Sequence, residues 1–244
     1  MESNIINDLS VQIYADGASI DQISNQNNIS WVKGFTTNPT LMKKNGIKNY
    51  KKFALDVMEI VNNKPVSFEV FSDDLYEMLD QAHEISSWNK NINVKIPITN
   101  TKGEYTLKII ENLNNSKIKC NVTALFSIDQ VRKVLEIIND ETFTIISIFA
   151  GRIADTGINP EVIISEAVDL VKQKNNIKIL WASPRELYNI FQADKLGCDI
   201  ITVAEDILSK ISNVGKDLNE FSLETVKMFY NDALSSNFKI DLKK

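Results

Sequence analysis

Residues 91–100, NINVKIPITN, contain the feature on which both the fold and the chemistry depend. Apolar residues surround Lys95, so the run is typical of a buried strand with one lysine inside it. A buried charge costs free energy unless it reaches solvent, has a partner or takes part in a reaction. Lys95 therefore either extends to the surface, pairs with a carboxylate such as Glu69 or Asp16, or serves as an amine in a dry pocket.

The run is one of eight short apolar or β-branched segments that we predict to be strands, at residues 11–15, 34–37, 65–71, 93–97, 118–124, 143–149, 177–182 and 199–203. Segments with helical spacing lie between them, the clearest at 50–61, 73–85, 127–138 and 159–174. Ser127 is a plausible helix N-cap, and Asn159 before Pro160 predicts a capped helix with proline in its first position.

Strands that alternate with helices predict parallel strands joined by helical crossovers. Eight such units in 244 residues is the size of a closed barrel. An open doubly wound sheet usually has a GxGxxG turn after its first strand, and the sequence has none. We therefore expect an α/β protein with one domain over residues 1–244, a (β/α)8 TIM barrel. Residues 217–244 form an additional C-terminal helical extension, which either covers the barrel mouth or docks on a neighbour.

The composition excludes several other classes of protein. A net charge of −5 disfavours nucleic-acid binding, and no apolar run approaches the roughly 18 residues of a membrane span. The N-terminus lacks a basic region followed by an apolar core, so we expect no secretory signal and a cytoplasmic location. Cys120 and Cys198 are expected to be buried free thiols, and no cluster of metal-ligand type predicts a metal site.

Polar residues recur at the carboxyl ends of the predicted strands, where a barrel holds its chemistry. In chain order they are Asp16, Asn38, Glu69, Lys95, Asn121, Thr123, Ser147, Arg152, Ser183 and Arg185. A single Asn or Ser at a strand end is usually a turn or cap residue, and a lone Glu can be a satisfied buried carboxylate. Because these groups converge on one axis, we expect them to form one site.

A dry pocket disfavours the charged form of Lys95 and so makes a neutral amine available. Such an amine attacks a carbonyl to form a Schiff base, which can accept electrons when a neighbouring C–C bond breaks. This chemistry needs an acid/base, for which Asp16 and Glu69 are candidates, and it needs no metal. Arg152, Arg185 and Ser183 would suit a phosphate monoester, although surface arginines are the simpler alternative.

Eight segments of the sequence resemble the transaldolases in order and spacing: YADGAS, GFTTNPTLM, FEVF, VKIPIT, NVTALFS, SIFAGRIAD, ILWASPR and GCDIITVAEDIL. The resemblance runs from about Asp16 to Leu208, and the length is similar to that of the short branch, which includes the fructose-6-phosphate aldolases. It implies an enzyme without a cofactor in the non-oxidative pentose phosphate pathway. This enzyme moves a dihydroxyacetone unit from a ketose phosphate, fructose 6-phosphate or sedoheptulose 7-phosphate, to an aldose phosphate, erythrose 4-phosphate or glyceraldehyde 3-phosphate.

The resemblance also implies a role for each site residue. Lys95 would form the Schiff base and Asp16 would take the hydroxyl proton beside the breaking bond. Glu69 and Thr123 would position a water that carries protons. The remaining residues would bind the substrate. Asn38, Asn121 and Ser147 would hold its hydroxyls, and Arg152, Ser183 and Arg185 would bind its phosphate.

The aldolase relatives are the nearest alternative. They typically have Gln in place of Glu69, Ala in place of Ser147, Tyr in place of Phe149, and a glycine-containing variant of the NVT motif. All four positions here are transaldolase-like, and Phe149 beside the substrate lacks the phenol that could help to release free dihydroxyacetone. We therefore expect a transaldolase. A fructose-6-phosphate aldolase and a non-catalytic sugar-phosphate-binding barrel stay as alternatives, as does a possible homo-oligomer. Gly17, where the family more often has threonine, leaves substrate preference open.

Overall fold

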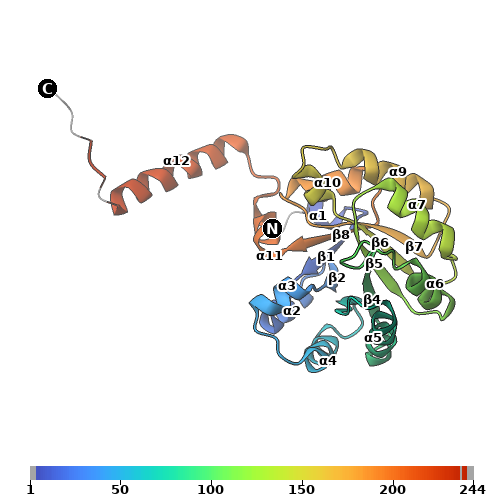
Figure 1. Ribbon diagram of the computed structural model, residues 1–244. Helices are drawn as coiled ribbons and strands as arrows, with labels where there is room; N and C mark the ends of the chain where they lie inside the picture. The colour runs from blue at the N-terminus through green and yellow to red at the C-terminus, as the bar shows by residue number, and fades with distance from the viewer. Residues whose placement is uncertain (1–3, 237, 241–244) are drawn as a thin grey trace.

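Eight parallel strands close into a barrel in sequence order in the computed structural model, which describes residues 4–236 and 238–240 (Figure 1). The strands are β1 (Gln12–Asp16), β2 (Val32–Thr36), β3 (Val66–Glu69), β4 (Ile92–Pro97), β5 (Cys120–Leu125), β6 (Thr144–Ile148), β7 (Ile177–Trp181) and β8 (Ile200–Ala204). Each predicted strand is present, displaced by at most a few residues. The (β/α)8 barrel is therefore confirmed.

Helices surround the barrel. They are α1 (Asn4–Asn7), α2 (Ile20–Asn27), α3 (Pro39–Lys44), α4 (Tyr50–Val61), α5 (Leu75–Trp88), α6 (Leu107–Asn115), α7 (Ile128–Ile137), α8 (Ala150–Ala154), α9 (Glu161–Val171), α10 (Tyr188–Lys195), α11 (Glu205–Leu208) and α12 (Leu218–Ser235), with a 3-10 helix, η1, at Ser209–Asn213. The main apolar core lies between the strands and these helices, because alternate strand residues point outward onto the apolar helix faces.

The helix signals in the sequence are confirmed in two cases and shifted in a third. α4 buries Phe53, Val57, Met58 and Val61 along one face, as its spacing predicts. Ser127 caps α7 in a reciprocal capping box with Gln130. The prediction for α9 is wrong by one residue. Pro160 occupies the cap position, and Asn159 accepts a hydrogen bond from the backbone N–H of Glu161 instead.

A second, smaller apolar cluster fills the inside of the barrel. It contains Tyr14, Ile145, Leu180, Ala182 and Ile200, which alternate along their strands with residues of the outer core. Tyr14 lies on the same face of β1 as Asp16, two residues before it, so its ring lies below the site. Burial raises the pKa of Tyr14 to about 12 and keeps the phenol neutral. The barrel is therefore closed beneath its C-terminal end.

Room for the Tyr14 ring comes from Gly34 on β2. A Cβ atom at Gly34 would lie 2.7 Å from two ring carbons of Tyr14. At Gly17, by contrast, a Cβ would meet no atom within 4 Å. Packing therefore requires a glycine at position 34 in β2. It does not require one at position 17, where the family more often has threonine.

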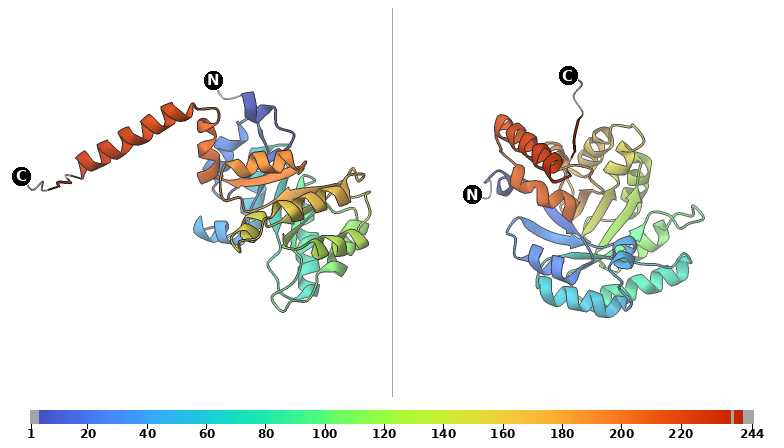
Figure 2. Two further views of the ribbon diagram at one scale, coloured as in Figure 1. Left: turned by 90° about the horizontal axis from the view of Figure 1, so that it is seen from above. Right: turned by 90° about the vertical axis from the view of Figure 1, so that its left-hand side faces the viewer.

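The chain after η1 leaves the barrel, whereas α11, which directly follows β8, still packs against it through the buried Ile207 and Leu208. α12 projects from its side, and two further views show the same separation (Figures 1 and 2). No residue of α12 is buried, and in this structure the helix does not cover the barrel mouth. No described helix combines the length and apolar character needed to cross a membrane.

Both cysteines are free and buried, as the sequence predicts. Burial raises the pKa of each thiol to about 12, so neither Cys120 nor Cys198 is ionised near neutral pH. They act as small packing residues.

Candidate active site

A pocket of about 400 Å³ lies at the carboxyl ends of the strands. Ten of the eleven predicted site residues line it: Asp16, Asn38, Glu69, Lys95, Asn121, Thr123, Ser147, Phe149, Arg152 and Ser183. The pocket also includes Thr36 and Thr202, which the sequence did not single out. A smaller cavity of about 240 Å³ adjoins it and shares Asp16, Ser183 and Thr202; we call it the side cavity.

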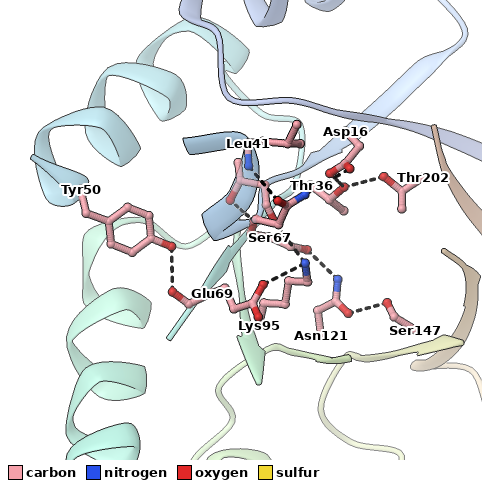
Figure 3. A network of polar contacts seen from close by, with 12 residues as sticks. Asp16, Thr36, Leu41, Tyr50, Ser67, Glu69, Lys95, Asn121, Ser147 and Thr202 are labelled. Atoms are coloured by element: carbon pink, nitrogen blue, oxygen red, sulfur yellow. Dashed lines mark hydrogen bonds and ion pairs between the residues drawn. The ribbon is translucent and has the colours of Figure 1, made fainter. Parts of the chain in front are cut away.

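Lys95 is 8% exposed and its amine stays inside the barrel (Figure 3). Its Nζ lies 3.0 Å from Glu69 Oε2 and donates a hydrogen bond to the backbone carbonyl of Thr37 at 3.1 Å. The β3–β4 register pairs Glu69 with Lys95, so the ion pair follows directly from strand alignment. Lys95 therefore does not extend to solvent, and its charge is balanced within the pocket.

The backbone of Glu69 is held in place by Tyr50. The Tyr50 hydroxyl donates to the backbone carbonyl of Glu69 at 2.9 Å, and burial raises the pKa of this phenol (Figure 3). Tyr50 thus remains a neutral donor and holds the end of β3. The carboxylate of Glu69 is left to face Lys95.

Asp16 ends β1 and has two hydrogen-bond donors. Thr36 donates to Oδ1 at 2.7 Å, and Asn38 Nδ2 lies 3.3 Å from Oδ2. Burial raises the pKa of Asp16, and this outweighs the lowering by Lys95 and by the Thr36 hydrogen bond. Asp16 therefore binds its proton more tightly than an ordinary aspartate. This property is suited to an acid/base that accepts and returns protons.

Asn121 is held at both ends of its amide. It donates to Ser67 Oγ at 3.0 Å and accepts from Ser147 Oγ at 2.6 Å. Thr123, two residues further along β5, is buried, and among the described residues its hydroxyl has no hydrogen-bond partner. Its neighbour Ala124 adopts a left-handed backbone (φ 61°) where the β5–β6 register shifts. The Thr123 hydroxyl, on a residue that lines the pocket, therefore has no partner among the described residues.

Arg152 supplies a cation at the rim of the pocket. Its guanidinium lies 5.4 Å from the ring centroid of Phe149, whose ring is in turn 5.7 Å from that of Phe126. Within residues 4–236 and 238–240 no carboxylate lies within ion-pair distance of Arg152. Its charge is thus available to an anionic ligand, and Phe149 supports it from below.

Arg185 differs from the expectation, because it lines the side cavity and not the main pocket. Its Nε donates to Asp155 Oδ1 at 2.9 Å, its Nη2 pairs with Asp155 Oδ2, and its Nη1 donates to Ser183 Oγ at 3.1 Å. The same pairing lowers the pKa of Asp155. The two predicted phosphate-binding arginines are therefore unequal: among the described residues Arg185 is paired with Asp155, whereas Arg152 forms no ion pair, although its charge helps to lower the pKa of Asp155.

The structure adds residues that the sequence reading missed. Thr36 contacts both Asp16 and Thr202, Ser67 contacts Asn121, and Asp155 holds Arg185. A sequence signal existed for Thr36 alone, since it lies two residues before Asn38 and so shares its side of the chain. Among the described residues, no group of three or more His, Cys, Asp or Glu side chains is arranged to hold a metal ion.

The fold and pocket define a (β/α)8 barrel with a lysine, two carboxylates and a free arginine at the carboxyl ends of its strands. The family model described as Transaldolase/Fructose-6-phosphate aldolase matches residues 13–243, and the chain belongs to this family. Its relatives include a probable transaldolase of Dehalococcoides mccartyi, 33% identical over 82% of this chain and 90% of that one. Another, from a Thermoanaerobacter species, is 31% identical over 96% and 98% of the two chains. These names indicate a transaldolase-type enzyme.

Comparison with solved structures supports the fold alone. A flavocytochrome b2 variant aligns with a TM-score of 0.58 at 11% identity, over 80% of this chain and 57% of its own. A putative phosphonomutase from Burkholderia cenocepacia aligns with a TM-score of 0.54 at 8% identity, over 94% and 97% of the two chains. At such identities the likeness lies in the barrel and not in the chemistry.

Proposed function

We propose that this protein is a transaldolase that moves a dihydroxyacetone unit between a ketose phosphate and an aldose phosphate through a Schiff base on Lys95. The observation that carries the proposal is the buried Lys95 amine, 3.0 Å from the Glu69 carboxylate and inside the same pocket as Asp16. Fructose 6-phosphate and sedoheptulose 7-phosphate are the proposed donors, and erythrose 4-phosphate and glyceraldehyde 3-phosphate the acceptors. The non-oxidative pentose phosphate pathway and a cytoplasmic location belong to the same proposal.

The first half of the reaction uses three side chains. Lys95 transfers a proton toward Glu69, and the resulting neutral amine adds to the ketone carbon of the donor. Loss of water, with protons passing through Glu69 and the unpartnered Thr123 hydroxyl, gives the iminium. Asp16 then takes the proton of the hydroxyl on the far carbon of the breaking bond, and this carbon becomes the aldehyde of the leaving sugar. The bond electrons flow into the iminium, which leaves an enamine on Lys95 and releases an aldose phosphate.

The second half reverses these steps with a new aldose phosphate. The enamine carbon attacks the acceptor aldehyde, and Asp16 returns its proton to the new hydroxyl oxygen. Water then hydrolyses the iminium, which frees the product and restores the Lys95 amine. In this proposal Asn38, Asn121 and Ser147, which line the pocket, hold hydroxyls of the bound three-carbon unit. Arg152, Ser183 and Arg185 hold the phosphate of the aldose phosphate.

Two features favour transfer over release of free dihydroxyacetone. Glu69 is a carboxylate paired with the lysine, and Phe149 presents a ring without a hydroxyl to the pocket. A fructose-6-phosphate aldolase remains the second candidate. A coupled assay separates the two: fructose 6-phosphate with erythrose 4-phosphate should give glyceraldehyde 3-phosphate rapidly, whereas omission of the acceptor should give almost no free dihydroxyacetone. Release at a similar rate without acceptor would identify an aldolase, and no turnover in either case would leave a sugar-phosphate-binding barrel.

A homo-oligomer is also proposed, with α12 as the contact. This helix carries large apolar side chains that are at least 40% exposed: Leu218, Phe221, Leu223, Val226, Met228, Phe229, Tyr230 and Leu234. Large exposed apolar side chains gathered on one helix are typical of an interaction site. Sedimentation of the full chain tests it, since a monomer at all concentrations would contradict the proposal.

A further inference from the structure

Two threonine hydroxyls join Asp16 in a row that crosses three neighbouring strands (Figure 3). Thr36 on β2 donates to Asp16 Oδ1 at 2.7 Å, and the Thr36 and Thr202 hydroxyl oxygens are 2.5 Å apart. Thr202 comes from β8, and β1 with Asp16 lies between the two strands. Thr36 is 2% exposed and Thr202 is 8% exposed, so solvent competes little for these bonds.

While Asp16 is ionised, the hydrogen bonds of this row can be donated in only one direction, toward the carboxylate. A carboxylate has no proton to give, so Thr36 must be the donor in its bond to Oδ1. A hydroxyl has a single proton, and that of Thr36 is thereby used. In the contact between the two threonines, Thr202 must then donate to Thr36. Each donated bond polarises the next, which strengthens the bond to the carboxylate.

The strand register explains why this row approaches Asp16 from below. On β8 the register partner of Asp16 is Ala204, while Thr202 is partnered with Tyr14, two residues deeper in the barrel. Thr36 is the register partner of Asp16 on the other side. The hydroxyls therefore occupy the inner side of the carboxylate. Among the described residues, the other oxygen, Oδ2, has only the longer 3.3 Å contact from Asn38.

We infer that Thr202 is a positioning residue for the acid/base: acting through Thr36, it commits Asp16 Oδ1 to a fixed acceptor role and leaves Oδ2 as the oxygen that exchanges the substrate proton. The inference rests on the proposed function of Asp16, but the hydroxyl row is a property of the free protein. Thr202 itself forms no bond to Asp16.

The charged and titratable surroundings of Asp16 set the sign of the expected effect. Lys95 on β4 and Glu69 on β3 face it across the main pocket, and Arg185 and Asp206 line the side cavity. Lys95 favours the ionised form, and Glu69 disfavours it. These charges are unchanged when Thr202 loses its hydroxyl. A less polarised and less fixed Thr36 stabilises the carboxylate less, so Asp16 should bind its proton more tightly.

The test replaces Thr202 by valine, which keeps the shape and removes the hydroxyl, and by serine, which keeps the hydroxyl. Thr142→Val is the matched control, because the Thr142 hydroxyl is also buried but donates to the backbone of Asn114, away from the pocket. We expect Thr202→Val to lower kcat about tenfold with little change in KM, consistent with one weakened hydrogen bond to a charged group. The acid limb of its pH–rate profile should move to higher pH. Thr202→Ser should restore both, and Thr142→Val should change neither.

A direct titration separates this inference from the proposed function. The Asp16 carboxyl carbon, followed by ¹³C NMR in the free protein, should titrate at higher pH in Thr202→Val than in the unmodified chain, whether or not the protein turns over sugar phosphates. An unchanged Asp16 titration in Thr202→Val, or a serine variant that behaves like the valine variant, would overturn the inference. Absence of transfer activity in the unmodified chain would overturn the proposed function alone.

Discussion

Lys95 Nζ and Glu69 Oε2 lie 3.0 Å apart, on residues that are register partners of adjacent parallel strands. The contact needs no loop and no long-range adjustment, because strand alignment alone brings the amine and the carboxylate together. In the same pocket, Asp16 has its own donors and a raised pKa. In the proposed mechanism the two carboxylates have separate roles: Glu69 exchanges a proton with the lysine, and Asp16 exchanges one with the substrate.

Glu69→Gln should slow turnover by about 10²-fold, the lower end of the range for loss of a general acid/base, because Asp16 remains in place. An amide can still accept a hydrogen bond from Lys95 but cannot take its proton. Borohydride trapping at short times should show slower imine formation. Tyr50→Phe is the control, since the Tyr50 hydroxyl donates to the backbone carbonyl of Glu69 and not to its carboxylate. Equal rates of imine formation in Glu69→Gln and the unmodified chain would contradict the assigned role.

Asp155→Asn should lower KM for fructose 6-phosphate by about threefold, because the exposed ion pair is weak and its loss leaves Arg185 free to attract a phosphate. The effect should fade at high salt and be absent for unphosphorylated fructose. Glu166→Gln, which breaks the exposed pair with Arg132 on the outer helices, should leave KM unchanged. A higher KM in Asp155→Asn would mean instead that Asp155 orients Arg185 for the substrate.

Gly34→Ala should reduce the free energy of unfolding by about 1–3 kcal/mol, the usual cost of forcing an extra methyl group into a packed interior. The new Cβ would lie 2.7 Å from ring carbons of Tyr14, a side chain that is only 2% exposed. Urea titration measures the loss. Gly17→Ala is the matched control, because nothing lies within 4 Å of its Cβ. Equal midpoints for the two variants would show that the barrel interior adapts.

Deletion of residues 217–244 should leave the free energy of unfolding of the barrel within about 0.5 kcal/mol of the full chain, as for changes that touch no core contact. α12 buries none of its residues. Transfer activity should fall more than stability does, and sedimentation should report monomers. Parallel loss of fold and activity would show that the helix stabilises the barrel itself.

The sequence predicts the barrel well because its evidence is periodic and repeated. Eight apolar runs with helices between them, and the absence of a GxGxxG turn, leave few other folds. The site residues at the strand ends were also predictable, because the carboxyl ends of all parallel strands lie at the same end of a barrel. Ten of the eleven predicted site residues line one pocket.

The hydrogen-bond and ion-pair partners of the site residues could not be predicted from the sequence, because they depend on how each side chain is oriented. The spacing from Asn38 places Thr36 on the side of the site, but it does not indicate that the Thr36 hydroxyl donates to Asp16 while the Thr37 backbone carbonyl accepts from Lys95. The pairing of Arg185 with Asp155 joins residues 30 positions apart in the sequence, with α9 and β7 between them. The direction of α12 was open as well, because an exposed helix without core contacts leaves no signal of where it points.

The most direct test of the account is to trap the intermediate on Lys95. Incubation with fructose 6-phosphate followed by borohydride should reduce the imine to a stable amine, and peptide mass spectrometry should place a three-carbon adduct on Lys95. Lys95→Met should carry no label. An adduct on another lysine, or wild-type transfer activity in Lys95→Met, would contradict the central claim.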